Sequence, residues 1–205
     1  MKKILLILSL LLTPVFATAT EPMAPDELVR ALTDEVLEVL RTDDHLAQGE
    51  TEPVVRAIEK LVLPHFNLRR MTALAVGRDW RDATPEQQER LVDAFYEMLV
   101  RTYSNALTEY RDQRVDFRPL RMSPDDRSVR VQTLIIQTGG AQPVAVDYMM
   151  GKTEGGWKAF DVVIAGVSLV TNYRSTFQRE IRANGIEGLI KSLETNEIPV
   201  DTGTP

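Results

Sequence analysis

The spacing of the hydrophobic residues changes twice along this 205-residue chain, and this feature constrains the fold more than any other. Up to about residue 111 the apolar residues recur every three or four positions, as they do on one face of an α-helix. From Arg114 to Ile164 they alternate or form β-branched runs, which is typical of strands. After Ser168 the helical spacing returns. The pattern predicts a sheet with helices before and after it.

The helical part before residue 111 contains recognisable start and stop signals. Apolar spacing predicts a helix over 25–41, and a second helix from Pro53 should end at Leu63, because Pro64 disfavours helical geometry in the residue before it. Asn67 is expected to cap a short third helix that Gly77 ends. Thr84-Pro85-Glu86-Gln87 has the composition of a capping box with proline at the first helical position, and it predicts a helix of about 27 residues.

The central segment predicts about four strands, near residues 115–120, 129–137, 144–150 and 157–164, with Gly-Gly turns at 139–140 and 155–156. Short connections of this kind join antiparallel neighbours. Two further helices are expected over 168–183 and 186–196, separated by Gly185. The predicted fold class is α+β, with helices packed on one face of a curved antiparallel sheet.

The first 19 residues have the composition of a signal peptide. Lys2 and Lys3 precede the apolar run 4–12, and Ala17-Thr18-Ala19 supplies small residues for cleavage. As a helix, this run would span only about 14 Å of a hydrocarbon core of about 30 Å. We expect a signal peptide at 1–19 and a single exported domain at 20–205. An uncleaved anchor is the alternative.

The composition argues against several classes of function. The formal charge is −6, and removing the two leader lysines leaves −8 on the expected mature chain, which is a poor match for nucleic acid. The sequence has no cysteine, so it has neither disulfides nor thiolate metal ligands. An oxidising compartment permits disulfides without requiring them, so their absence is compatible with export.

The sequence contains no recognisable catalytic or metal-binding motif. His45 and His65 stand outside HExxH or HxH spacing, and we interpret both as surface or packed residues. Asp147 and Asp161 each interrupt an apolar strand. Such an aspartate would serve as a general base in a cone-shaped α+β enzyme. The alternative is a residue that faces water or pairs with an arginine such as Arg130 or Arg174.

Two separated motifs resemble the MlaC family, also called the toluene-tolerance family of periplasmic phospholipid carriers. The first comprises GWKAFDV at 156–162 and IAGVSLVTNYR at 164–174, with Phe177 one turn later. The second is VGRDWRDATPEQ at 76–87. Ala165 stands where the family pattern leads us to expect a glutamate, which argues against a charged role at that position.

The resemblance implies a periplasmic shuttle that maintains outer-membrane lipid asymmetry. Such proteins carry phospholipid between an outer-membrane lipoprotein–porin complex and an inner-membrane ABC transporter. The resemblance implies no cofactor, no metal and no turnover of the lipid. A carrier that visits two complexes in turn is expected to be a monomer.

A carrier of this kind must enclose the acyl chains. Exposing one chain to water costs about 11 kcal/mol at about 0.8 kcal/mol per methylene. We therefore expect the helices and the sheet to enclose an apolar cavity, with Tyr173 and Phe177 at its rim or hinge. Adaptable thioethers such as Met98 would suit varied chains. The candidate lipid-binding residues are Phe95, Met98, Leu99, Tyr103, Val144, Val146, Tyr148, Met150, Phe160, Val162, Ile164, Tyr173 and Phe177.

Two other functions remain open at this stage. An isomerase-like enzyme would use Asp147 or Asp161 as its base and would show a strongly raised carboxyl pKa. A lipid-free periplasmic adaptor would bind membrane complexes through exposed helices, and its interior would be filled by protein. Periodicity alone does not separate these possibilities, because it identifies the buried face of an element and not what fills the space beneath it.

Overall fold

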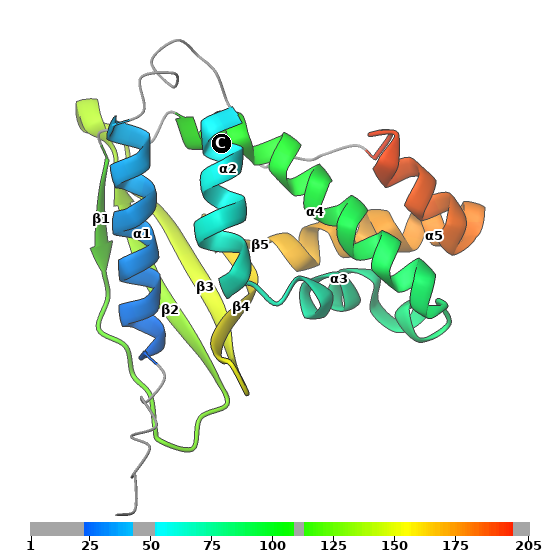
Figure 1. The fold of residues 1–205 in the computed structure, drawn as a ribbon, viewed down its shortest axis with the longest axis horizontal. Helices are drawn as coiled ribbons and strands as arrows, with labels where there is room; N and C mark the ends of the chain where they lie inside the picture. Colours follow the sequence, from blue (N-terminus) through cyan, green and yellow to red (C-terminus); the bar gives the residue numbers. More distant parts are fainter. Residues whose placement is uncertain (1–22, 43–51, 109–112, 199–205) are drawn as a thin grey trace, which may run out of the picture.

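The computed structural model describes residues 23–42, 52–108 and 113–198 (Figure 1). The expected signal peptide and His45 lie outside these ranges. The fold is α+β, as predicted from the sequence. Figure 1 shows α1 and α2 in front of one face of the sheet, while α3, α4 and α5 form a helical lobe beside it. No helix in the described ranges combines the length and the apolar character needed to cross a membrane.

The sheet is fully antiparallel, and its strand order follows the chain. The four predicted strands are present, and a two-residue fifth strand follows them. The strands are β1 (Arg114–Phe117), β2 (Ser128–Ile136), β3 (Val144–Thr153), β4 (Gly156–Ile164) and β5 (Val167–Ser168).

A β-bulge interrupts the pairing of β3 with β4. Met149 pairs with Asp161, but Met150 pairs with Ala159, so Phe160 is an extra residue without a partner on β3. An extra residue reverses the alternation of side chains between the two faces of a strand. Ala159 and Val162 therefore lie on one face of β4, although simple alternation would place them on opposite faces.

The predicted helix signals are confirmed at most positions. Asn67 accepts a hydrogen bond from the Arg70 backbone N–H, and Gly77 ends that helix with φ of 76°. Thr84 and Gln87 bond each other reciprocally, as in a capping box. The helices are α1 (Pro25–Thr42), α2 (Glu52–Ala57), η2 (Ile58–Val62), η3 (Leu63–His65), α3 (Leu68–Val76), η4 (Gly77–Arg81), α4 (Pro85–Thr108), η5 (Thr138–Gly140) and α5 (Leu169–Glu194).

Two predicted helices differ in detail from the structure. The segment expected to be one regular helix over 53–63 is α-helical only to Ala57; it continues as the π-helical turn η2 and the 3₁₀ turn η3, which contains Pro64. The two expected C-terminal helices form α5, which bends at Gly185, where φ is 73°. Glycine adopts this left-handed φ without the steric cost that a side chain would add.

The largest solid core lies in the helical lobe, between α3, α4 and α5. Its centre is aromatic: the Phe95 ring meets Tyr173 and Phe177 in edge-to-face geometry, with centroids 5.3 and 5.1 Å away. Such pairs contribute stability beyond their buried area. A second, smaller core lies between α1 and the sheet and contains Val29, Val131 and Trp157.

Candidate functional site

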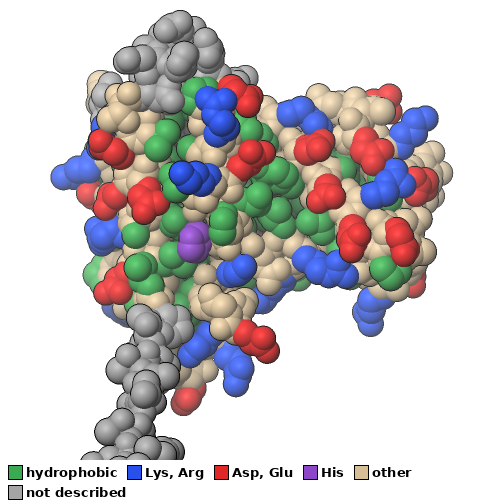
Figure 2. Space-filling model, in the orientation of Figure 1, with side chains coloured by type: hydrophobic (Ala, Val, Ile, Leu, Met, Phe, Trp, Pro, Cys, Tyr) green, Lys and Arg blue, Asp and Glu red, His purple; other side chains and the backbone are tan. Residues whose placement is uncertain are grey.

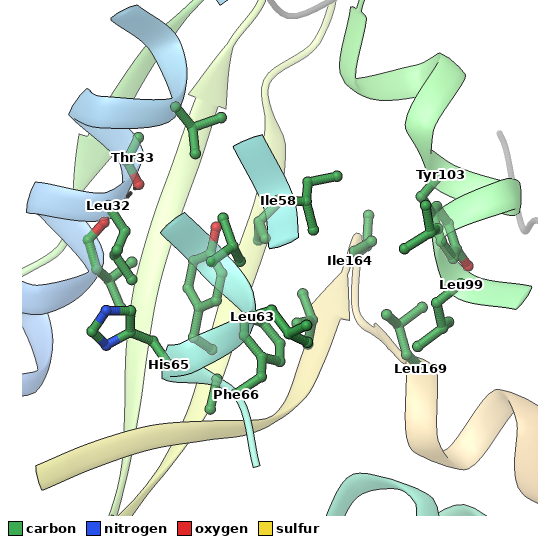
Figure 3. Close-up of a pocket in the computed structure, with 18 of the residues that line it drawn as sticks. Leu32, Thr33, Ile58, Leu63, His65, Phe66, Leu99, Tyr103, Ile164 and Leu169 are labelled. Atoms are coloured by element: carbon green, nitrogen blue, oxygen red, sulfur yellow. Dashed lines mark hydrogen bonds between the residues drawn. The ribbon is translucent and has the colours of Figure 1, made fainter. Parts of the chain in front are cut away.

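An apolar cavity of about 370 Å³ lies between the sheet and the helices in front of it. Figure 3 shows side chains from α1, η2, η3, α4 and β4 facing this space, among them Leu32, Ile58, Leu63, Leu99 and Ile164. The cavity thus has a sheet for its floor, α1 and α4 for its walls, and the segment η2–η3 for its roof.

The floor consists of alternate residues on neighbouring strands. Val146, Tyr148 and Met150 on β3 face the cavity because residues two apart share one face of a strand. The residues that pair with them on β4 are Ile164, Val162 and Ala159, in that order. The bulge at Phe160 places Ala159 on the same face of the strand as Val162 and Ile164. Val115 on β1 and Ile135 on β2 extend the floor.

The walls and roof are also mainly aliphatic. The helix α1 contributes a continuous stripe at helical spacing, and α4 contributes two aromatic residues. The wall residues are Val29, Leu32, Thr33, Val36, Leu37 and Leu40 from α1, and Tyr96, Leu99, Val100, Tyr103 and Ser104 from α4. The roof consists of Ile58, Val62, Leu63 and His65, and the lining is completed by Phe66, Leu68, Met71, Gln113 and Leu169.

The electrostatics of the cavity suit an apolar occupant. No Asp, Glu, Lys or Arg belongs to the lining formed by the described residues. The Thr33 hydroxyl donates to the Val29 carbonyl at 2.7 Å, which satisfies it within its own helix. Burial raises the pKa of Tyr148 to about 12, because the phenolate would be poorly solvated there. Such a cavity accepts hydrocarbon readily and disfavours ions.

The structure brings seven of the thirteen candidate residues together around this cavity. They are Leu99, Tyr103, Val146, Tyr148, Met150, Val162 and Ile164. Val144 lies at the start of β3, half-buried and outside the lining. The other five candidates are buried elsewhere.

Four of these five belong to the solid core of the helical lobe. Phe95, Met98, Tyr173 and Phe177 are at most 2% exposed and pack against one another. The rim position expected for Tyr173 and Phe177 is therefore wrong, because both lie at the centre of the lobe. Burial raises the pKa of the Tyr173 hydroxyl. Helical spacing correctly identified these residues as buried, but protein fills the space around them.

Phe160 is the extra residue of the β-bulge, and it does not line the cavity as Ala159, Val162 and Ile164 do. The guanidinium of Arg70 lies over its ring, 3.6 Å from the centroid. Gly151 makes room for this stack, since a Cβ at that position would meet the Arg70 guanidinium at 2.5 Å. A local irregularity of this kind has no signal in an alternating hydrophobic pattern.

The two strand aspartates have partners outside the cavity lining. The Asp161 carboxylate accepts hydrogen bonds from the Ser168 hydroxyl at 2.6 Å and from the Val170 N–H at 3.1 Å. Asp147 lies 3.7 Å from Arg130, one of the arginines expected to pair with it. Within residues 23–42, 52–108 and 113–198, no three His, Cys, Asp or Glu side chains gather where they could hold a metal ion.

Comparison with known proteins identifies the family. The family model described as MlaC protein matches residues 30–195, which is most of the chain. This chain belongs to the MlaC family. The resemblance seen in the two sequence motifs is thereby confirmed, and the matched range includes both of them.

Individual relatives of this MlaC-family chain agree over most of its length. A protein of Haemophilus influenzae named intermembrane phospholipid transport system binding protein MlaC is 24% identical over 198 residues, covering 95% of this chain and 92% of the relative. The toluene tolerance protein ttg2D of Pseudomonas putida is 24% identical over 162 residues, covering 78% and 74%.

A solved structure is similar in fold to this MlaC-family chain. It is the phospholipid-binding protein from Ralstonia solanacearum in complex with a phospholipid, with a TM-score of 0.77 and 35% sequence identity. The likeness covers 82% of this chain and 93% of that one.

Sequence reasoning missed the contribution of α1 and of η2–η3 to the cavity of this MlaC-family protein. The signal in α1 was present, since Leu32 and Val36 belong to the apolar spacing that predicted the helix. The roof residues had no comparable signal, because a π-helical turn does not follow the 3.6-residue period.

Proposed function

We propose that this protein is a periplasmic phospholipid carrier that holds acyl chains in the cavity between the sheet and η2–η3. The observation that carries the proposal is the uncharged lining of the cavity between the sheet and the helices. A protein of similar fold, 35% identical, has been solved in complex with a phospholipid. The charged headgroup would remain in water, where it needs little from the protein.

The proposed lipid contacts are the seven candidate residues that line the cavity, with the additional residues from α1 and the roof. Tyr148 lies in the middle of the floor, between Val146 and Met150 on β3. Met150 supplies a flexible thioether at the floor, and Met71 supplies another from α3. Phe95, Met98, Phe160, Tyr173 and Phe177 are not among the proposed contacts.

The proposed carrier performs no chemistry on its cargo. A strand aspartate that acts as general base would have to face the ligand, but Asp161 and Asp147 both have partners outside the lining. His65 belongs to the lining, but among the described residues it is not part of a group of three His, Cys, Asp or Glu side chains that could hold a metal ion. The alternative of a lipid-free adaptor with a filled interior is disfavoured by the cavity itself.

The cellular role follows from the family and from the leader sequence. We propose that the signal peptide directs the chain to the periplasm. There, as a monomer, it would exchange phospholipid with an outer-membrane lipoprotein–porin complex and with an inner-membrane ABC transporter. A soluble shuttle is needed because free lipid does not cross an aqueous gap at a useful rate when exposure costs about 11 kcal/mol per chain.

Native mass spectrometry of the protein purified from a periplasmic extract tests the proposal. We expect adducts of one or more phospholipid masses that denaturation releases. Val162→Arg would place a cation in the floor and should remove the adduct, whereas Val163→Arg, one residue along the same strand and outside the lining, should retain it.

Val162→Trp provides a second variant, in case the charged substitution prevents folding, because it reduces the cavity volume without burying a charge. A bare protein mass from gentle preparations of the parent chain would contradict the carrier proposal and favour the adaptor. Lipid retained in folded Val162→Arg and Val162→Trp would contradict the proposed position of the acyl chains.

A further inference from the structure

The roof of the cavity is a short irregular segment, residues Ile58–His65, which comprises η2 and η3 and is called the strap below. None of its residues is buried, although several face the cavity. The helices on either side are anchored much better: α2 buries Val54 and Ala57, and α3 buries Met71 and Ala75. Ile58 packs against the small core of Leu40 and Val54, and no other strap residue packs against a hydrophobic core of the described residues.

The backbone of the strap changes its hydrogen-bonding pattern twice within eight residues. The α-helical pattern ends at Ala57, and a π-helical turn follows, which the Leu63 N–H closes on the Ile58 carbonyl. A 3₁₀ turn then contains Pro64, which has no N–H to donate. π-helical turns are rare and occur often at functional sites, and 3₁₀ bonds have poorer geometry than α-helical bonds. Rearrangement of this segment sacrifices little regular structure.

Both ends of the strap are fixed. Before it, Val54 and Leu40 are each 1% exposed and share a small core between α2 and α1. After it, Phe66 forms an isolated bridge with Ala159, and the Asn67 N–H donates to the Ala159 carbonyl at 2.7 Å. The strap thus connects two anchored points across the cavity.

On the side of α4, a single long hydrogen bond joins side chains of the strap and the wall within the described residues. The Tyr96 hydroxyl donates to Glu59 Oε1 at 3.4 Å. This distance is beyond the usual range for a strong O–H donor. Figure 2 shows hydrophobic side chains in the hollow between α2 and α4, and Tyr96, which makes this bond, also lines the cavity.

We propose that the strap is the gate of the cavity: it moves away from α4 about the ends fixed near Ala57 and Phe66, and acyl chains pass between it and Tyr96. The Tyr96–Glu59 bond is the latch of this gate. The sheet and the helical lobe keep their positions during the movement. The inference rests on the proposed function, because it names the route by which the cargo of that cavity enters and leaves.

Crosslinking tests the gate directly, because the chain has no cysteine of its own. The double variant Glu59→Cys with Tyr96→Cys, joined by a short bis-maleimide, would tie the strap to α4. The matched control is Arg90→Cys with Glu187→Cys, which joins α4 to α5 where an ion pair of 2.5 Å already connects them. The readout is the transfer of a pyrene-tailed phosphatidylethanolamine between the protein and vesicles.

We expect crosslinking to slow uptake and release at least tenfold relative to the same Glu59→Cys, Tyr96→Cys protein before crosslinking. Crosslinking the control pair should leave its own rate unchanged. Unchanged transfer after complete strap crosslinking would overturn the gate.

Amide hydrogen exchange of the lipid-free parent gives an independent readout. We expect faster exchange in the strap than in α3; equal protection of the two segments would also overturn the gate. A parent protein that takes up no lipid but exchanges strap amides rapidly would count against the carrier function and leave the mobility of the strap supported.

Discussion

The Ser168 hydroxyl donates a hydrogen bond of 2.6 Å to the Asp161 carboxylate and, at the same time, accepts one of 3.0 Å from the Thr171 N–H. A carboxylate on β4 therefore holds the first turn of α5, where negative charge is also favoured by the helix dipole. Because α5 carries Tyr173 and Phe177 into the lobe, this joint sets the position of the solid core relative to the cavity floor.

Asp161→Ala should lower the free energy of unfolding by about 2–3 kcal/mol, because it leaves buried donors without an acceptor. Asp147→Ala should cost less than about 1 kcal/mol, since its partner Arg130 is 3.7 Å away and more than half exposed. Urea unfolding followed by circular dichroism measures both. Equal losses in the two variants would contradict the structural role of Asp161.

Phe177→Leu should lower the free energy of unfolding by about 1–2 kcal/mol, because it removes the edge-to-face contact with Phe95 from a packed core. The folded variant should still co-purify with phospholipid, because Phe177 does not line the cavity. Native mass spectrometry and urea unfolding of the same preparation provide the two readouts. Lipid loss from a well-folded Phe177→Leu protein would place this side chain in contact with the cargo after all.

Ala165→Asn should raise the free energy of unfolding by about 0.5–1 kcal/mol. Ala165 and Gly166 form the two-residue turn between β4 and β5, with φ of 48° and 86°. Two positive φ values are typical of a type I′ turn, which asparagine tolerates better than alanine. Thermal unfolding measures the change. Gly166→Ala, at a site with open space around it, should have the opposite effect through backbone strain alone.

Tyr148→Phe should flatten the alkaline stability profile. The pKa of Tyr148 is raised by burial to about 12, so the unfolded chain loses this proton first as the pH rises. The contribution of Tyr148 to the free energy of unfolding is fully present below pH 10. It declines between about pH 10 and 12, by about 1.4 kcal/mol per pH unit. Urea unfolding at closely spaced pH values compares the two proteins. Parallel profiles would show that Tyr148 is solvated in the folded state.

Much of the fold was predictable from sequence because its signals are local. The capping box at Thr84, the Asn67 cap and the Gly185 bend each depend on residues within one or two turns. The period of two predicted β2, β3 and β4 because each has one face packed toward the helices. The two-residue strand β5 is too short to show a period.

The lining of the cavity was predictable only in part. Leu99 and Phe95 both lie on the apolar face of α4, yet Leu99 faces the cavity and Phe95 faces α5. This division depends on which element packs opposite each residue, and periodicity carries no information about that. Phe160 and the strap depend on a β-bulge and a π-helical turn, which depart from the regular periods on which sequence reasoning rests.

The separation of the aromatic core from the cavity bears on how such a protein can change over evolutionary time. Phe95, Tyr173 and Phe177 stabilise the lobe without lining the cavity. Their packing therefore offsets stability that substitutions at Leu32, Val146 or Val162 would lose. Lineages that meet different lipids can reshape the interior by small steps while the chain continues to fold. The same division makes the scaffold a rational starting point for engineering carriers of other amphiphiles.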